Sequence, residues 1–227
     1  MCGRYVLTHE EHLLEEWLEA ALDIYLKPRY NIAPTQPIPI ARIEPETKRR
    51  HITFAFWGLI PSWSKDPSIG SKLINARSET LREKPSFKGN FKYRRCLIPA
   101  SGFYEWKAIT KGPKTPHYIR MLDEYPFAFA GLWDTYLSPD GSEVDTATII
   151  TTQANPLIRV LHQRMPVIIP REHFDQWLNP DNIKATNLDK LLIPYPADEM
   201  TYYPVSTDVN TVKNDRPDLI TPTSLFS

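Results

Sequence analysis

The chain has 227 residues, and its 41% hydrophobic and 11% aromatic content suits one globular domain with a substantial core. Its 27 lysines and arginines balance its 27 aspartates and glutamates, so any binding to nucleic acid requires a local basic surface. Two cysteines and six scattered histidines form no disulfide framework or zinc pattern, and no run of about 18 apolar residues is present, so we expect a cytoplasmic protein without metal, cofactor or membrane contact.

The first predicted element is a helix over residues 9–23. Thr8 followed by Glu11 forms a capping-box pattern, and apolar side chains then recur at helical spacing. After this helix, proline and glycine bound short runs that are rich in β-branched and aromatic residues, which predict strands. These runs begin at Pro37, His51, Arg95, His117, Pro126 and Ala147.

Two helices are predicted late in the chain. Asn155 and Pro156 suit the cap and first position of one, and Pro170 suits the start of the other. The 22 prolines are scattered, and no repeat or shift in composition marks a boundary. We therefore expect one α+β domain over residues 1–227, with a largely antiparallel sheet curled toward a barrel and flanked by helices.

The opening peptide MCGRY places a cysteine directly after the initiator methionine. Loss of Met1 would leave Cys2 with an α-amine and a thiol on adjacent carbons. Such an amine titrates near 8, roughly two and a half units below lysine, so part of it is neutral at physiological pH. A single cysteine at a frayed chain end is also a common incidental feature. Whether Cys2 is a reactive residue or an incidental one therefore depends on the other peptides of the sequence.

A second unusual peptide is SGFYEW, which contains Glu105 among aromatic and small residues. Strand alternation would place Phe103 and Glu105 on one face and Tyr104 and Trp106 on the other. A carboxyl group among aromatic rings should have a raised pKa, which suits a general acid. The alternative is a surface glutamate on an amphipathic strand.

Seven peptides, in this order, resemble the SOS response-associated peptidase family of abasic-site-processing proteins. They are MCGRY, RYNIAPTQ, WGLIPSW, LINARSET, CLIPASGFYEW, HQRMPVII and YPVSTDVNTVKN. The resemblance covers nearly the whole chain. It implies that the protein binds single-stranded DNA at an abasic site and becomes covalently joined to the DNA through Cys2. The chemistry is consistent, because a free amine can condense with the sugar aldehyde and the neighbouring thiol can then close a thiazolidine ring.

The resemblance also assigns roles to three further side chains. It makes Glu105 the proton shuttle, His162 a second acid, base or sugar-positioning group, and Asn75 the group that orients Cys2 or the sugar. Local sequence alone favours blander roles for two of them. A histidine near a helix end is commonly a cap residue, and an asparagine in a short loop is commonly a turn former.

Four residues are predicted to contact DNA. Arg4 and Arg77 suit phosphate contacts, because the guanidinium fork pairs with phosphate through two hydrogen bonds. Trp63 and Phe103 are candidate platforms on which a base could stack. Two basic clusters, Lys48 to His51 and Lys92 to Arg95, would either extend this surface or form solvated strand edges.

Two other functions stay open at this stage. One is a cysteine peptidase in which the thiol of Cys2 attacks a peptide bond, including the Met1–Cys2 bond, with His162 or Glu105 as the base. The other is a non-covalent reader of modified or single-stranded DNA, which would need neither Cys2 nor Glu105. The expected partner is single-stranded DNA containing an abasic site, bound by a monomer.

Overall fold

The computed structural model describes residues 2–22, 24–108 and 112–223. Five strands form a closed ring in the order β11, β10, β7, β4, β5, and a parallel pairing of β5 with β11 closes it. The other neighbours in the ring are antiparallel. The bounds are β4 Pro37–Ile43, β5 Arg50–Trp57, β7 Arg95–Ala100, β10 Phe127–Leu137 and β11 Glu143–Gln153.

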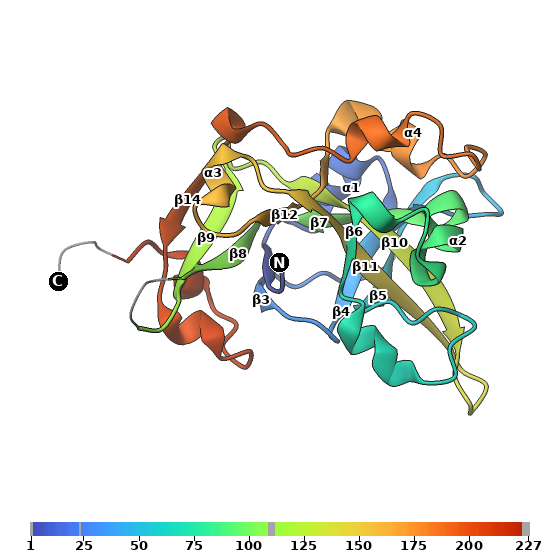
Figure 1. Ribbon diagram of the computed structural model, residues 1–227, viewed down its shortest axis with the longest axis horizontal. Helices are drawn as coiled ribbons and strands as arrows, with labels where there is room; N and C mark the ends of the chain where they lie inside the picture. Colours follow the sequence, from blue (N-terminus) through green and yellow to red (C-terminus); the bar gives the residue numbers. More distant parts are fainter. Residues whose placement is uncertain (1, 23, 109–111, 224–227) are drawn as a thin grey trace.

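A second, five-stranded antiparallel sheet lies beside this barrel (Figure 1), in the order β14, β9, β8, β1, β3. Ser101 alone separates β7 of the barrel from β8 of the second sheet, so the two sheets share one continuous stretch of chain. The bounds are β1 Tyr5–Leu7, β3 Arg29–Ile32, β8 Gly102–Lys107, β9 Thr115–Met121 and β14 Met200–Pro204.

Short strands and helices complete the described fold. The strands are β2 Ala21–Leu22, β6 Asn75–Arg77, β12 Arg164–Pro166 and β13 Ile168–Ile169, and the α-helices are α1 Glu11–Leu18, α2 Pro85–Tyr93, α3 Pro156–Arg159 and α4 Phe174–Leu178. Within the described ranges, no helix is long and apolar enough to cross a membrane.

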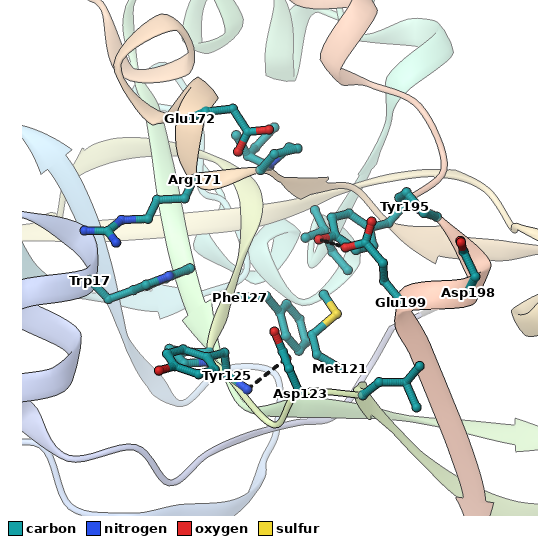
Figure 2. A pocket seen from close by; sticks show the side chains of 16 residues that line it. Trp17, Met121, Asp123, Tyr125, Phe127, Arg171, Glu172, Tyr195, Asp198 and Glu199 are labelled. Atoms are coloured by element: carbon teal, nitrogen blue, oxygen red, sulfur yellow. Dashed lines mark hydrogen bonds between the residues drawn. The ribbon is translucent and has the colours of Figure 1, made fainter.

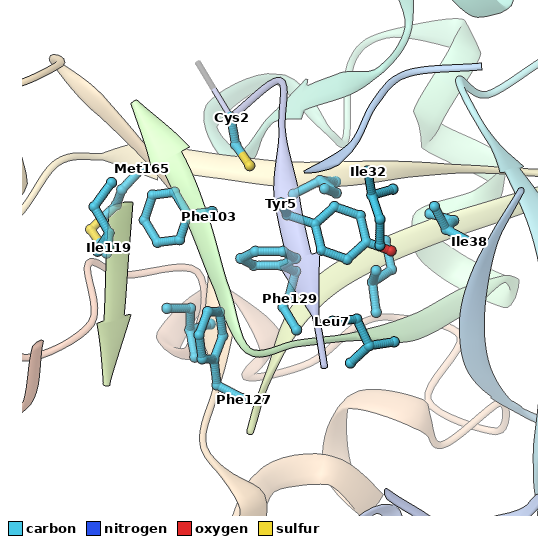
Figure 3. Close-up of a cluster of buried hydrophobic side chains, with 14 of the residues drawn as sticks. Cys2, Tyr5, Leu7, Ile32, Ile38, Phe103, Ile119, Phe127, Phe129 and Met165 are labelled. Atoms are coloured by element: carbon cyan, nitrogen blue, oxygen red, sulfur yellow. The ribbon is translucent and has the colours of Figure 1, made fainter. Parts of the chain in front are cut away.

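Side chains along the barrel strands alternate between two buried clusters. Interior positions such as Ile98 and Phe129 join β1 and β8 side chains in one cluster (Figure 3). Outward positions such as Leu97 and Ala130 pack under α2 and α4, where Phe91 and Trp177 cover them. The prediction of an α+β domain with a curled, largely antiparallel sheet is confirmed.

The strand predictions are confirmed, with the run from Arg95 divided into β7 and β8. The helix predicted over 9–23 is too long, because Glu19 adopts a left-handed conformation (φ 50°) and the chain then forms β2. The predicted capping box is wrong: Thr8 Oγ1 donates to Ser101 Oγ at 3.2 Å, and Glu10 precedes the helix without a side-chain cap. The late helix after Asn155 begins where predicted, and the Asn155 side chain accepts a hydrogen bond from the Ile158 amide.

Candidate active site

Cys2 lies just before β1, and the pairing of β1 with β3 and β8 fixes its position. Its side chain is fully buried at one end of the interior cluster (Figure 3). Asn75 Nδ2 donates a hydrogen bond of 2.8 Å to the Cys2 carbonyl, and the backbone amide of Tyr104 donates to the Arg4 carbonyl at 3.0 Å. The segment from Cys2 to Arg4 is therefore fixed by hydrogen bonds and is not a frayed end.

Burial raises the pKa of the Cys2 thiol, and the nearby Glu105 carboxylate raises it further. A thiol in this environment stays protonated at neutral pH. Attack by sulfur therefore requires a neighbouring group that accepts the thiol proton during the reaction.

Glu105 is only 3% exposed, and it lies in β8 opposite His117 of β9. Burial raises the pKa of its carboxyl group, and the positive charge of His162 partly offsets that rise. The carboxyl group thus keeps its proton at a higher pH than an exposed glutamate. Cys2 and His162 both lie within electrostatic reach of it.

His162 follows α3, where its backbone amide donates to the Ile158 carbonyl at 3.0 Å. The Arg164 amide donates to His162 Nδ1, also at 3.0 Å. The Arg164 carbonyl also lies 3.2 Å from Nδ1, so the backbone of Arg164 holds the ring in place and is compatible with either tautomer. His162 thus lies at a helix end, as expected for a cap residue. It also lies close to Glu105, as expected for a second acid or base.

Asn75 begins β6, which pairs in parallel with β11 opposite Ile149. While Nδ2 holds the Cys2 carbonyl, Oδ1 is buried and has no hydrogen-bond partner among the described residues. A buried acceptor without a donor costs free energy, and a bound hydroxyl or amine would remove that cost. The structure therefore brings Cys2, Asn75, Glu105 and His162 together from four separate elements.

The four predicted DNA-contacting residues have different surroundings. Trp63 is 61% exposed and free to stack against a base. Phe103 is fully buried, with its ring centroid 6.0 Å from that of Phe129, so the prediction that it stacks on a base is wrong. Arg4 donates to Asn31 Oδ1 at 2.8 Å and to the Val209 carbonyl at 2.7 Å. These bonds give Arg4 a bracing role, and a phosphate contact stays a prediction.

Arg77 is exposed at the end of β6, and it lines a groove of about 490 Å³. The other lining residues are Gln153, Arg159, Gln163 and Arg164. Three guanidinium groups and two amides suit a phosphate-bearing strand. Sequence reasoning missed Arg159 and Arg164. The pairing of β11 with both β6 and β12 brings Arg164 beside Arg77, and α3, which follows β11, carries Arg159 to the same groove.

Within this groove, Arg164 already has an anionic partner. Its two terminal nitrogens donate to the two carboxylate oxygens of Glu79, each at 2.9 Å. The pair lowers the pKa of Glu79 through the Arg164 hydrogen bond. Glu79 therefore occupies the planar fork that a phosphate would otherwise use.

Each of the two basic clusters contains one buried arginine. Arg50 pairs with Asp175 at 2.6 Å, and Arg95 donates to the Trp177 carbonyl at 2.6 Å, so both hold α4 against the barrel. These two arginines are therefore not available to DNA, whereas Arg49 is exposed, and a contribution of the other cluster residues to a DNA-binding surface stays a prediction. Among the described residues, no group of three or more histidine, cysteine, aspartate or glutamate side chains is placed to hold a metal ion.

Comparisons with known proteins show similar chains in one family and similar folds. A family profile described as SOS response associated peptidase (SRAP) matches residues 1–212. The chain is 44% identical over 226 residues to "Abasic site processing protein YoqW" of Bacillus subtilis (strain 168), covering 97% of this chain and 99% of the relative. "Abasic site processing protein HMCES" of Gallus gallus is 32% identical over 240 residues, covering 92% of this chain and 70% of the relative. A crystal structure of a protein from Bacteroides thetaiotaomicron superposes with a TM-score of 0.86 at 27% identity, covering 98% of this chain and all of the other.

Proposed function

The chain belongs to the SOS response associated peptidase family, and from that premise we propose that it processes abasic sites in single-stranded DNA by forming a covalent bond through Cys2. The names of the two relatives support abasic-site processing. The observation that carries the covalent mechanism is the grouping of Cys2, Asn75 and Glu105. The mechanism requires a mature chain that starts at Cys2, because only then is the α-amine free.

The first chemical step is condensation with the abasic sugar. The ring-opened deoxyribose presents an aldehyde at C1′, and the neutral α-amine of Cys2 adds to that carbon. The protonated carboxyl of Glu105 donates a proton to the resulting hydroxyl, which leaves as water and gives a protonated imine beside the Glu105 carboxylate. A buried carboxyl with a raised pKa is suited to hold this proton until it is needed.

The second step closes the ring. The thiol of Cys2 passes its proton to the Glu105 carboxylate as its sulfur adds to C1′ of the protonated imine, and the nitrogen keeps its proton as the ring amine. One aldehyde, one amine and one thiol thus give one thiazolidine and one water. Because the amine and thiol belong to the same residue, closure is intramolecular and strongly favoured by proximity.

The DNA strand in this proposal passes through the groove beside Arg77 and Arg164, with Trp63 stacking against a neighbouring base. Asn75 holds the Cys2 carbonyl and offers Oδ1 to a hydroxyl of the opened sugar. His162, within electrostatic reach of Glu105, favours the ionised carboxyl in the steps where Glu105 accepts a proton.

The test is the intact mass of protein incubated with an oligonucleotide carrying one abasic site. Protein lacking Met1 should gain the oligonucleotide mass less one water, about 18 Da. Cys2→Ala should leave at most an adduct that heating removes, since its amine can form only an imine. Cys2→Ser is the matched control, because its hydroxyl closes a far less stable ring. A heat-stable adduct of equal yield from Cys2→Ala would refute the thiazolidine.

The family description and the presence of a thiol, an imidazole and a carboxyl in one place also support a second function, removal of Met1 by the protein itself. The discriminating variant is Glu105→Gln purified from cells. Retention of Met1 in that variant alone would support self-processing. Complete removal would assign the step to a cellular aminopeptidase. Purified wild-type protein that lacks Met1 yet forms no adduct would leave peptidase activity or non-covalent binding to DNA as the remaining functions.

A further inference from the structure

A hollow of about 690 Å³ lies apart from the Cys2 site, where α1, the turn from β9 to β10, the start of the α4 region and the segment 195–199 meet (Figure 2). Phe127 forms part of its wall, and Figure 3 shows Phe127 and Cys2 at opposite ends of the interior cluster. The proposed DNA chemistry therefore makes no use of this hollow.

The walls of the hollow are apolar and aromatic. Trp17 comes from α1, Tyr125 from the turn before β10, and Tyr195 from the segment after α4. Tyr125 is 58% exposed, so a large part of this aromatic surface faces solvent. Walls of this kind gain free energy by covering aliphatic or aromatic atoms of a ligand.

The rim of the hollow is acidic. Its four carboxylates come from three separate segments: Asp123 follows β9, Glu172 lies in a 3-10 turn, and Asp198 and Glu199 lie in another. Figure 2 shows Asp123 directed toward the centre of the hollow. These charges repel the phosphates of DNA, so the hollow is not an extension of the nucleic-acid surface.

Arg171 is the one basic side chain among the described residues that line the hollow, and it does not neutralise the rim. Its guanidinium group turns toward α1, where it donates to the Glu16 carbonyl at 3.3 Å and pairs with Glu19 at 3.4 Å. Figure 2 shows it pointing away from the other labelled side chains. The rim carboxylates therefore have no cationic partner among the described lining side chains and can pair with a cationic ligand.

Tyr195 lies within electrostatic reach of three of these carboxylates. Its hydroxyl donates to Glu199 at 2.8 Å. Burial raises the pKa of this tyrosine, and the charges of Glu199, Asp123 and Glu172 raise it further. Three carboxylates from separate segments therefore act on one aromatic wall, where a cation would also gain from the ring face.

We infer that this hollow binds a basic segment of a partner protein, with lysine or arginine side chains that pair with the rim and apolar side chains that cover the aromatic walls. Two features favour a peptide over a small free cation. The volume is much larger than one ammonium or guanidinium group requires, and the carboxylates are spread around the rim, which suits several cations joined along one chain.

The probe is a synthetic nine-residue peptide that alternates leucine and arginine, and the control peptide has glutamate in place of arginine. Binding is followed through the indole N–H signal of Trp17 in the nitrogen-15 spectrum, assigned with Trp17→Phe. The arginine peptide should shift this signal saturably. The double variant Glu172→Gln/Glu199→Gln should weaken binding about tenfold, since it removes two charges and keeps their hydrogen-bonding shape.

Glu46→Gln, on an exposed turn, is the matched control and should bind the peptide like the wild type. Equal binding of the two peptides, or an unchanged affinity of the double variant, would overturn the inference. Spermidine binding as tightly as the peptide would also overturn it and assign the hollow to free polyamines. A Trp17 shift that depends only on protein concentration would assign it to a second copy of this chain.

The double variant should form the DNA adduct at the wild-type rate, because neither substituted residue lies near Cys2. Loss of peptide binding with intact adduct formation would therefore separate this inference from the proposed function.

Discussion

Glu105 is the single residue whose surroundings most constrain the proposed chemistry. Its carboxyl group is buried beside the Cys2 thiol, and burial raises its pKa. The same group can therefore donate a proton when water leaves and accept one when sulfur adds. An exposed glutamate would already be ionised at neutral pH and could perform only the second task.

We predict that Glu105→Gln slows adduct formation by about 10² to 10⁴-fold, because the amide cannot transfer a proton. The wild-type rate should rise with pH as the α-amine loses its proton and then fall above the raised pKa of Glu105. The glutamine variant should keep the rise and lose the fall. Single-turnover rates between about pH 5 and pH 9 measure both features, and a variant rate within threefold of the wild type would contradict the role of Glu105.

Phe103 and Trp63 should respond in opposite ways to substitution. Phe103→Ala removes a fully buried ring and should lower the free energy of unfolding by about 3 to 5 kcal/mol. Trp63→Ala should change it by less than about 0.5 kcal/mol and should weaken binding to single-stranded DNA by about 1 to 3 kcal/mol. Urea unfolding and fluorescence anisotropy measure the two effects. Equal effects of both variants on DNA affinity would argue against the stacking role of Trp63.

Residue-level prediction succeeded where the pattern was local. Alternation along β8 correctly placed Phe103 and Glu105 on one face. It could not show that the rings of Phe127 and Phe129 from the barrel cover that face at Phe103. A glutamate in a strand usually lies on the face exposed to solvent. Glu105 is buried instead, as the proposed acid/base chemistry requires.

At the level of elements, the end of α1 shows why periodicity alone misleads. The apolar spacing continues to Leu22, although the helix ends at Leu18. Leu22 lies in β2, which pairs with β5, and its apolar side chain packs against the cluster under α2 and α4. Its backbone amide donates to the Glu15 carboxylate at 3.2 Å. A short strand directly after a helix fits the same pattern of apolar residues as one more helical turn.

The contact between β12 and the turn after β6 leads to a further prediction. Since Glu79 occupies the guanidinium fork of Arg164, Glu79→Gln should raise the affinity for undamaged single-stranded DNA several-fold. The loss of this partly exposed ion pair should cost less than about 1 kcal/mol of stability. Anisotropy titrations in a Cys2→Ala background measure the affinity, with the exposed Glu83→Gln as control. Weaker binding would show that Glu79 positions Arg164 for the strand.

At the scale of the whole molecule, the sequence predicted the strands and their curling but not the closure of the barrel. Closure depends on Phe56 and Trp57 meeting Thr146 and Ala147, about ninety positions later. Such a register follows from tertiary packing and has no local signal. The grouping of Cys2 with Asn75 is likewise a product of the fold, and only the resemblance of several peptides to a known family indicated it.

Because the formal net charge of the whole chain is zero, attraction to DNA must come from a local basic surface. We predict that Arg77→Ala reduces the slope of log affinity against log salt concentration by about 0.7, the value for one phosphate contact on a single strand. Arg49→Ala, exposed on a distant turn, should leave the slope unchanged. Titrations at several salt concentrations decide the matter, and equal slopes for the two variants would exclude a phosphate contact by Arg77.

The fastening of the first strand to a late segment of the chain affects the order of events during synthesis. Arg4 and Asn31 donate to carbonyls of Val209 and Asn214, and β1 also pairs with β8. A ribosome releases the first residues long before it releases the segment around 209–214. The contacts of Arg4 and Asn31 with that segment therefore form late, and until then fewer bonds hold the chain near Cys2, which leaves it more accessible to a methionine-removing enzyme.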